Sequence, residues 1–125
     1  MKAYRIVDAD FVKREIGRMP LVDVRPPLRY DEGHIPGAVN VRLDMAAASN
    51  DPSEELAEMF REDGIYPEDA AIVYCQIGVH AKIACDYLAS EGYSNLYLYA
   101  GSMNDWASDP ARPVQRSQAA FARAS

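Results

Sequence analysis

The sequence predicts an α/β domain with a mainly parallel sheet. Short apolar runs alternate along the chain with segments whose apolar residues follow a helical period, which is typical of repeated strand–helix units. The length of 125 residues is that of one domain, and 49% hydrophobic with 26% charged residues is the composition of an ordinary folded protein. A chain of this size buries roughly two-thirds of its unfolded surface, so it needs neither disulfides nor a metal for stability.

Five apolar runs are the predicted strands. They comprise residues 4–7, 21–24, 39–43, 71–74 and 96–99. The run 71–74 (AIVY) is apolar at every position, which is typical of a buried strand, whereas 39–43 carries the weakest signal. After the second run, the pair Pro26-Pro27 indicates a turn.

Three segments between these runs carry helix signals. Asp8 is suited to cap the first helix. The second helix begins with Asp51-Pro52-Ser53-Glu54, which supplies a cap, a proline at the first helical position and a carboxylate at the third, and Gly64 is suited to end it. The third begins near His80 and ends at Gly92, with apolar residues at helical spacing between them.

The domain boundary is expected near residue 114. The alternating pattern is lost after about residue 107, and the last residues are small and polar. We therefore expect one domain over residues 1–114 and a C-terminal tail over 115–125, which is either a frayed helix or disordered.

Charge and cysteine content exclude several classes of function. Thirteen Lys and Arg against nineteen Asp and Glu give a net charge of −6, which argues against nucleic-acid binding and against an anionic membrane surface. No apolar run reaches the roughly 18 residues of a membrane span, and charges interrupt the N-terminus where a signal peptide would be apolar. With two cysteines and no such signal, we expect a cytoplasmic protein with both thiols reduced. A local site can still be positive and take a small anion.

Cys75 is the candidate nucleophile. It directly follows the buried run 71–74 and precedes the third predicted helix, and in open α/β sheets binding sites lie beyond the carboxyl ends of strands. A loop of backbone N–H groups that leads into a helix attracts anions and stabilises a thiolate. Gly78 allows the loop to fold tightly around the sulfur. From position alone, a small buried hydrophobic residue at the end of a strand is an equally good interpretation of Cys75.

Three segments, in order along the chain, resemble the rhodanese family of sulfurtransferases. They are Leu21-Val22-Asp23-Val24-Arg25, Gly33-His34-Ile35-Pro36-Gly37-Ala38 and Cys75-Gln76-Ile77-Gly78-Val79-His80. Gly101-Ser102, followed by Asp105-Trp106, resembles the closing motif of the family. The resemblance covers about residues 3–114 and is closest in kind to the catalytic domain of thiosulfate and 3-mercaptopyruvate sulfurtransferases.

The resemblance implies a three-layer domain, with a five-stranded parallel sheet between helices on both faces. It also implies that Cys75 cycles between thiolate and persulfide, with the backbone amides of Gln76, Ile77, Gly78, Val79 and His80 around the terminal sulfur. The partners would be a small anionic sulfur donor such as thiosulfate, and a thiol, cyanide or sulfur-accepting protein as acceptor. We expect no cofactor.

Residues outside the cysteine loop receive supporting roles. Arg29 occupies a position where the resemblance implies a contact to the anionic donor. The planar guanidinium group of arginine suits sulfonate or carboxylate oxygens. The alternative is that Arg29 is a surface arginine paired with Asp31 or Glu32. Asp23 and Arg25 are expected to anchor loops by hydrogen bonds. His34 is expected to be a hydrogen-bonded turn residue.

The cysteine loop departs from the family pattern at two positions. Ile77 stands where many members have a polar or basic residue, and His80 stands where the loop often ends in Arg, so the loop carries no permanent cation. His80 either donates a hydrogen bond to the donor or leaving group, or faces solvent on the first helical turn. Cys85 lies on the apolar stripe of the third helix, which favours core packing. The spacing of Cys75, His80 and Cys85 does not fit a zinc site, so no metal is expected.

Two other functions compete with sulfur transfer. A phosphatase or arsenate reductase would need an arginine six residues after the cysteine, and that position holds Ala81. A persulfide carrier that works with a protein partner, and turns over small donors little, remains open because the loop lacks a cation.

Overall fold

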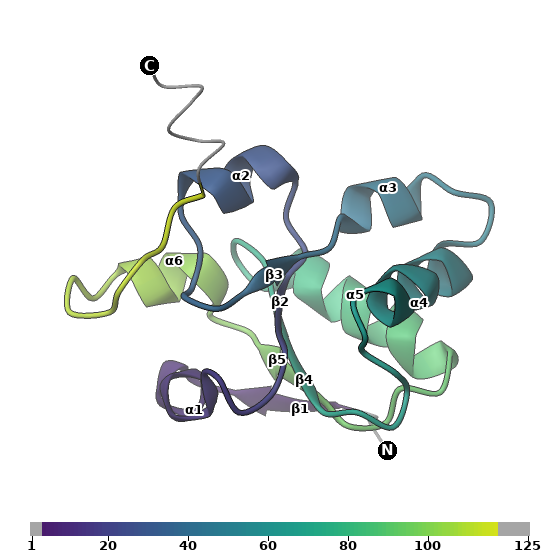
Figure 1. Ribbon diagram of the computed structural model, residues 1–125, viewed down its shortest axis with the longest axis horizontal. Coiled ribbons are helices and arrows are strands. Elements are labelled where there is room, and N and C mark those ends of the chain that lie inside the picture. Colours follow the sequence, from purple (N-terminus) through teal and green to yellow (C-terminus); the bar gives the residue numbers. More distant parts are fainter. Residues whose placement is uncertain (1–3, 118–125) are drawn as a thin grey trace.

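The computed structural model describes residues 4–117, and its centre is a five-stranded sheet whose neighbouring strands are all parallel (Figure 1). The strands are β1 (Tyr4–Val7), β2 (Leu21–Asp23), β3 (Val39–Asn40), β4 (Ala71–Tyr74) and β5 (Leu96–Tyr99). Their order across the sheet is β1-β5-β4-β2-β3, so β4 is the central strand. The predicted α/β class and parallel sheet are confirmed.

Six helices lie between or after the strands within these residues. They are α1 (Ala9–Glu15), α2 (Pro27–Glu32), α3 (Leu43–Ala47), α4 (Pro52–Glu62), α5 (Val79–Ser90) and α6 (Ser102–Ala107). The two predicted caps are present: the Asp8 carboxylate accepts the Phe11 N–H at 2.9 Å, and the Asp51 carboxylate accepts the Glu54 N–H at 3.2 Å. The predicted starts of these two helices are therefore confirmed.

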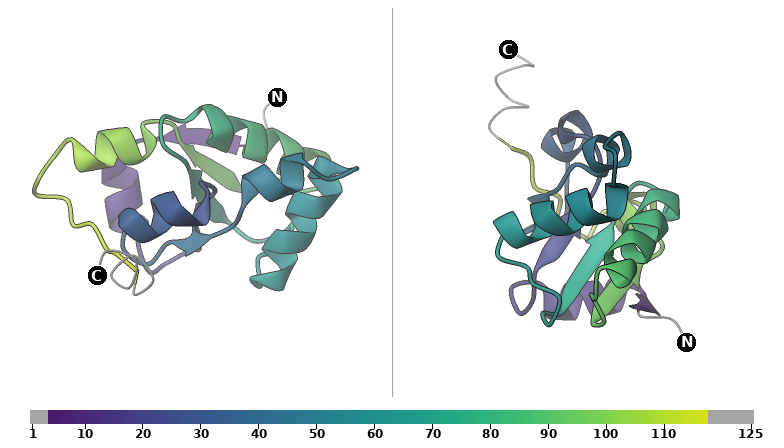
Figure 2. Two further views of the ribbon diagram at one scale, coloured as in Figure 1. Left: turned by 90° about the horizontal axis from the view of Figure 1, so that it is seen from above. Right: turned by 90° about the vertical axis from the view of Figure 1, so that its right-hand side faces the viewer.

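The sheet separates two apolar layers. Because side chains alternate along a strand, Ala71 and Val73 of β4 belong to one cluster, whereas Ile72 and Tyr74 belong to the other. The first cluster also takes residues from α3, α4 and α5, and the second takes residues from α1 and α6. Figures 1 and 2 show these two groups of helices on opposite sides of the sheet, which is the expected three-layer arrangement.

Two segments differ from the sequence-based expectation. The strand expected over 39–43 is shortened to Val39–Asn40, because the chain turns into α3 at Leu43. The pair Pro26-Pro27 does not form a simple turn: Pro27 is the first residue of α2, a position that a helix tolerates since the first N–H groups of a helix lack partners within it.

Residues 113–117 return across the domain beside α2. Gln115 pairs with His34 through two backbone hydrogen bonds of 2.8 and 2.9 Å, and the Ser117 hydroxyl donates to Asp31 at 2.5 Å. The rest of the expected tail, residues 118–125, lies outside the described part of the chain. Within the described part, no helix has the length and apolar character needed to cross a membrane.

Candidate active site

Cys75 lies at the carboxyl end of the central strand. It is the first residue after β4, and α5 begins at Val79, so four residues connect the strand to the helix. Since β2 and β5 run parallel to β4 on either side, their carboxyl ends and the residues that follow them meet at this edge (Figure 1). The position is therefore the one at which open α/β sheets bind ligands.

The sulfur of Cys75 receives two backbone N–H groups. Gly78 N lies 3.1 Å and Ala81 N lies 3.2 Å from Sγ, and the residue is only 1% exposed. Donors fixed in the backbone stabilise negative charge on sulfur without having to reorient. Gly78 is one of the expected donors, whereas the donor Ala81 was not expected. Ala81 belongs to the first turn of α5, where N–H groups have no partner inside the helix.

Gly78 brings the cysteine loop close to Ala100, the residue that follows β5. Its φ of 95° lies in the left-handed region, and a Cβ at this position would stand 2.2 Å from the carbonyl oxygen of Ala100. Only glycine satisfies both the backbone conformation and the available space. Because glycine allows the loop to pass so close to Ala100, the loop turns tightly and two N–H groups point at one sulfur.

Ser102 links the start of α6 to the cysteine. Its hydroxyl accepts the Cys75 N–H at 3.1 Å and donates to the Tyr99 carbonyl at 2.9 Å, and it lies 3.8 Å from Sγ. Ser102 is fully buried and has a φ of 58°, an unusual conformation for a residue with a side chain. The sequence motif that contains Ser102 did not indicate this position beside the sulfur.

Asp23 and Arg25 form a buried ion pair behind the loop. Arg25 Nη2 lies 2.7 Å from an Asp23 oxygen and also donates to the Gly33 carbonyl at 2.7 Å, while Nη1 donates to the side chain of Gln76 at 3.0 Å. Burial alone would lower the pKa of Arg25, but the hydrogen bonds and charge of Asp23 raise it above its ordinary value. The pair thus ties β2 to the turn before Ile35 and to the cysteine loop.

His34 and Arg29 lie in contrasting surroundings. The His34 ring is buried, stacks on Tyr30 at 3.8 Å between ring centroids, and places Nδ1 2.8 Å from the Tyr30 carbonyl. Arg29 lies on α2 with 67% of its side chain exposed, and its guanidinium is 3.6 Å from the Glu32 carboxylate. Its role toward a donor anion stays a prediction.

Two branched aliphatic side chains are exposed on the cysteine loop. Ile77 is 59% and Val79 is 56% exposed, and the neighbouring His80 is exposed as well. The loop therefore offers backbone N–H groups to the sulfur and branched aliphatic side chains to whatever approaches from solvent. Gln76 is also exposed, and two hydrogen bonds hold its side chain, to Arg25 and to Asn104.

Cys85 has no such donors around it. It is fully buried in the apolar cluster on the α5 side of the sheet, and burial raises the pKa of its thiol to about 12. This environment agrees with the expected role in core packing. Among residues 4–117, no group of three or more His, Cys, Asp or Glu side chains is arranged to hold a metal ion.

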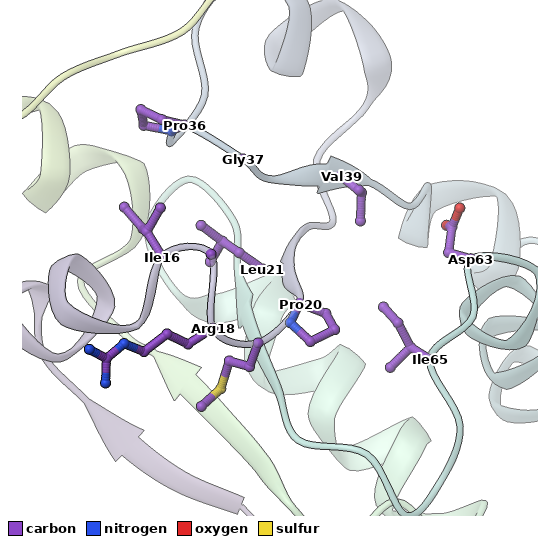
Figure 3. Close-up of a pocket in the computed structure, with 11 residues that line it drawn as sticks. Ile16, Arg18, Pro20, Leu21, Pro36, Gly37, Val39, Asp63 and Ile65 are labelled. Carbon is purple, nitrogen blue, oxygen red and sulfur yellow. The ribbon is translucent and has the colours of Figure 1, made fainter.

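A separate pocket of about 470 Å³ opens at the opposite end of the sheet. Its walls come from the segment that leads into β2 (Ile16 to Leu21), from Pro36, Gly37 and Val39, and from Asp63 and Ile65 after α4 (Figure 3). Pro20 and Leu21 mark the amino end of β2, whereas Cys75 follows the carboxyl end of β4, and the two strands are parallel. The pocket therefore does not belong to the cysteine site.

The fold and the site together define a class of protein. It is a parallel α/β domain with a buried cysteine at the end of its central strand, and the sulfur of this cysteine receives two backbone N–H groups. The family model described as a Rhodanese-like domain matches residues 8–109, and the chain belongs to this family. The resemblance noted in the sequence is thereby confirmed.

Several curated relatives are named sulfurtransferases. The chain is 41% identical over 106 residues to the thiosulfate:glutathione sulfurtransferase of Saccharomyces cerevisiae, covering 78% of this chain and 73% of the relative. It is 32% identical to a thiosulfate sulfurtransferase of Corynebacterium glutamicum, covering 82% of this chain and 40% of the relative. A thiosulfate sulfurtransferase of Pseudomonas aeruginosa is 29% identical, with 85% of this chain and 44% of the relative covered. The chain thus spans less than half of the latter two proteins.

Solved structures share the fold. EanB superposes with a TM-score of 0.76 at 21% identity over 90% of this chain and 28% of its own. A rhodanese-related protein from Thermoplasma volcanium superposes with a TM-score of 0.69 at 18% identity over 91% of this chain and all of its own. At these identities the likeness supports the architecture and not a particular substrate.

Proposed function

We propose that this protein is a sulfurtransferase that moves a sulfane sulfur from thiosulfate or 3-mercaptopyruvate to a thiol or cyanide acceptor through a persulfide on Cys75. The observation that carries the proposal is the pair of N–H groups, from Gly78 and Ala81, at 3.1 and 3.2 Å from a buried Sγ. Such donors favour a sulfur anion, which is the reactive form of the thiol before and after transfer. Family membership and the names of the relatives support the same reaction class.

With thiosulfate as donor, the first step forms a bond between Cys75 Sγ and the sulfane sulfur. The Cys75 thiolate attacks that sulfur, the S–S bond of thiosulfate breaks, and sulfite departs with the bonding electron pair. No other oxidant or reductant is required, because the cysteine gains the sulfur atom that the donor loses. The product is a Cys75 persulfide anion, whose terminal sulfur needs N–H donors of its own.

The second step transfers the terminal sulfur to the acceptor. An acceptor thiolate attacks it, a new S–S bond forms on the acceptor, and the Cys75–S bond breaks to return the Cys75 thiolate. Cyanide in the same role gives thiocyanate. The name of the yeast relative favours glutathione as the acceptor thiol to be tested first.

Arg29 is the proposed contact for the donor anion. The loop itself has no Lys or Arg between Cys75 and Ala81, so a permanent positive charge must come from another element. Arg29 is exposed on α2, and the 3.6 Å separation from Glu32 is an exposed ion pair that a divalent anion can replace. The His80 side chain is the second candidate, as a hydrogen-bond donor from the first turn of α5.

The mass of the intact protein after incubation with each donor tests this function. Wild-type protein should gain one sulfur atom from thiosulfate or 3-mercaptopyruvate, and a reductant should remove it. The Cys75→Ser variant should gain none, whereas Cys85→Ser, as the matched control, should load like wild type. Absence of loading with both donors would overturn small-donor sulfur transfer.

A persulfide carrier for a protein partner is the second candidate, because Ile77 and Val79 expose more than half of their surface beside the cysteine. A carrier should accept sulfur from a protein persulfide and load negligibly from thiosulfate. The same mass measurement therefore separates the two functions. A phosphatase is disfavoured since Ala81, whose N–H binds Sγ, occupies the position where the oxyanion-binding arginine would stand.

A further inference from the structure

The start of α6 fixes the orientation of the first two peptide groups of the cysteine loop. Met103 N donates to the Cys75 carbonyl at 3.0 Å, and Asn104 N donates to the Gln76 carbonyl at 3.0 Å. In a planar trans peptide the carbonyl and the N–H point in opposite directions. With both carbonyls facing α6, the N–H groups of Gln76 and Ile77 face away from it.

These two N–H groups have no partner of their own. In the described residues, neither Gln76 N nor Ile77 N finds an acceptor, whereas Gly78 N and Ala81 N are engaged by Sγ. Both residues are exposed, and an exposed backbone N–H group without a protein acceptor is open to water or to a ligand. A sulfur or oxygen atom added beyond Sγ is the natural acceptor for them.

The side chains of Gln76 and Asn104 reinforce this arrangement. Gln76 Nε2 donates to Asn104 Oδ1 at 2.7 Å, and Gln76 Oε1 accepts from Arg25 Nη1 at 3.0 Å. Arg25 is held in turn by Asp23. Gln76 is exposed, so burial does not order its side chain; the hydrogen bonds on both ends of its amide do.

We propose that Gln76 and Asn104 form a latch that aims the N–H groups of Gln76 and Ile77 at the terminal sulfur of the Cys75 persulfide. The two side chains are positioning residues: neither needs to touch the substrate, and they act through the peptide groups whose carbonyls α6 holds. The role of the latch in holding the persulfide rests on the proposed sulfur transfer. The effect of the latch on the order of the loop does not depend on that function.

Variants of both residues, singly and together, test the latch. Gln76→Met keeps the length of the side chain without its hydrogen bonds, Asn104→Ala removes the partner, and Asn50→Ala is the control at an exposed asparagine outside the site. Amide hydrogen exchange at Gly78 and Ala81, followed by NMR, reports loop order without any sulfur donor. Loading of Cys75 by thiosulfate under single-turnover conditions reports the functional consequence.

Asn104→Ala should accelerate exchange at Gly78 and Ala81 and slow sulfur loading by about three- to tenfold, the scale of one lost hydrogen bond. Gln76→Met should do so at least as strongly, because it also loses the hydrogen bond from Arg25. The double variant should add little to the effects of Gln76→Met, since that variant has already lost the hydrogen bond to Asn104. Asn50→Ala should match wild type. Unchanged exchange in either single variant, or effects that multiply in the double variant, would overturn the latch. Failure of wild-type protein to load sulfur would overturn the proposed function, and the exchange data would still decide the latch.

Discussion

The two cysteines occupy equally buried positions and differ in what surrounds them. Cys75 is 1% exposed and Cys85 is 0% exposed, yet Sγ of Cys75 receives two backbone N–H groups, whereas burial raises the pKa of Cys85 to about 12. Burial therefore does not distinguish the two thiols of this domain. The direction of the nearby backbone dipoles does, and a strand-to-helix turn supplies them at Cys75.

Replacement of each cysteine should give the largest contrast. Cys75→Ala should abolish sulfur transfer, because no other thiol in the domain is held by N–H donors, while Cys85→Ala should retain most of the activity. Thiocyanate formation from thiosulfate and cyanide measures both variants. Equal loss in the two variants, with both still folded, would contradict the distinction.

Replacement of a glycine should reduce sulfur loading when the glycine lies in the cysteine loop, and should leave loading unchanged when it lies elsewhere. Gly78→Ala would place a Cβ 2.2 Å from the Ala100 carbonyl oxygen at a φ of 95°, so we expect loss of loading by at least about tenfold and destabilisation by about 2–4 kcal/mol. Gly64→Ala is the matched control, because Gly64 has a φ of 77° and no atom within 4 Å of the added Cβ.

The control should lose about 1 kcal/mol and keep full loading. Thermal unfolding and the rate of persulfide formation measure the two effects separately. A Gly78→Ala protein that loads sulfur at the wild-type rate would show that the tight approach to Ala100 is unnecessary.

The raised pKa of Cys85 should make the stability of the fold depend on pH in the alkaline range. Burial raises the pKa of this thiol from 9.0 to about 12, so the folded state holds a proton that the unfolded state releases, and stability falls as pH rises from about 9 toward 12. The linkage amounts to at most about 1.4 kcal/mol per pH unit in that window. Burial raises the pKa of Tyr74 and Tyr99 as well, and they act in the same direction.

Denaturant titrations at pH 8, 9 and 10 should therefore show a steeper loss of stability in wild type than in Cys85→Ala. The comparison uses the change in the free energy of unfolding with pH and not its absolute value, because removal of the thiol also changes packing. Parallel pH profiles of the two proteins would argue against a neutral Cys85 thiol in the core.

Arg29 should have the smallest effect. Arg29→Ala should raise the thiosulfate concentration needed for half-maximal loading by about three- to tenfold, since a charge-assisted contact to the donor is lost, with little change in stability. Arg61→Ala is the control, because Arg61 forms a similar surface ion pair with Glu58 on α4. Identical donor dependence in the two variants would remove Arg29 from the site.

The fold was predictable where the pattern was local and strong. Strands at 4–7, 71–74 and 96–99 and the capped starts of α1 and α4 follow from apolar runs and single capping residues. Helices α2, α3 and α6 were not predicted. Each has five or six residues, too few to display a helical period, and tertiary contacts stabilise them.

In the candidate site, the sequence predicted residues of the cysteine loop but not the residues of α6 that contact the loop. Cys75 and Gly78 stand out because a strand ends beside them, and a helix start follows. The contributions of Ser102 and Asn104 were missed, because they depend on how α6 packs against the loop from about 27 residues further along the chain. Ala81 was missed because its side chain is featureless and its backbone N–H does the binding.

Peptide mapping of thiosulfate-treated protein tests the central claim most directly. After alkylation and digestion, mass spectrometry assigns any added sulfur to the peptide that holds Cys75 or to the one that holds Cys85. We predict a persulfide on Cys75 and an unmodified Cys85. Added sulfur on Cys85, or on neither residue, would contradict the proposal that the N–H groups at the end of β4 make Cys75 the residue that accepts the sulfur.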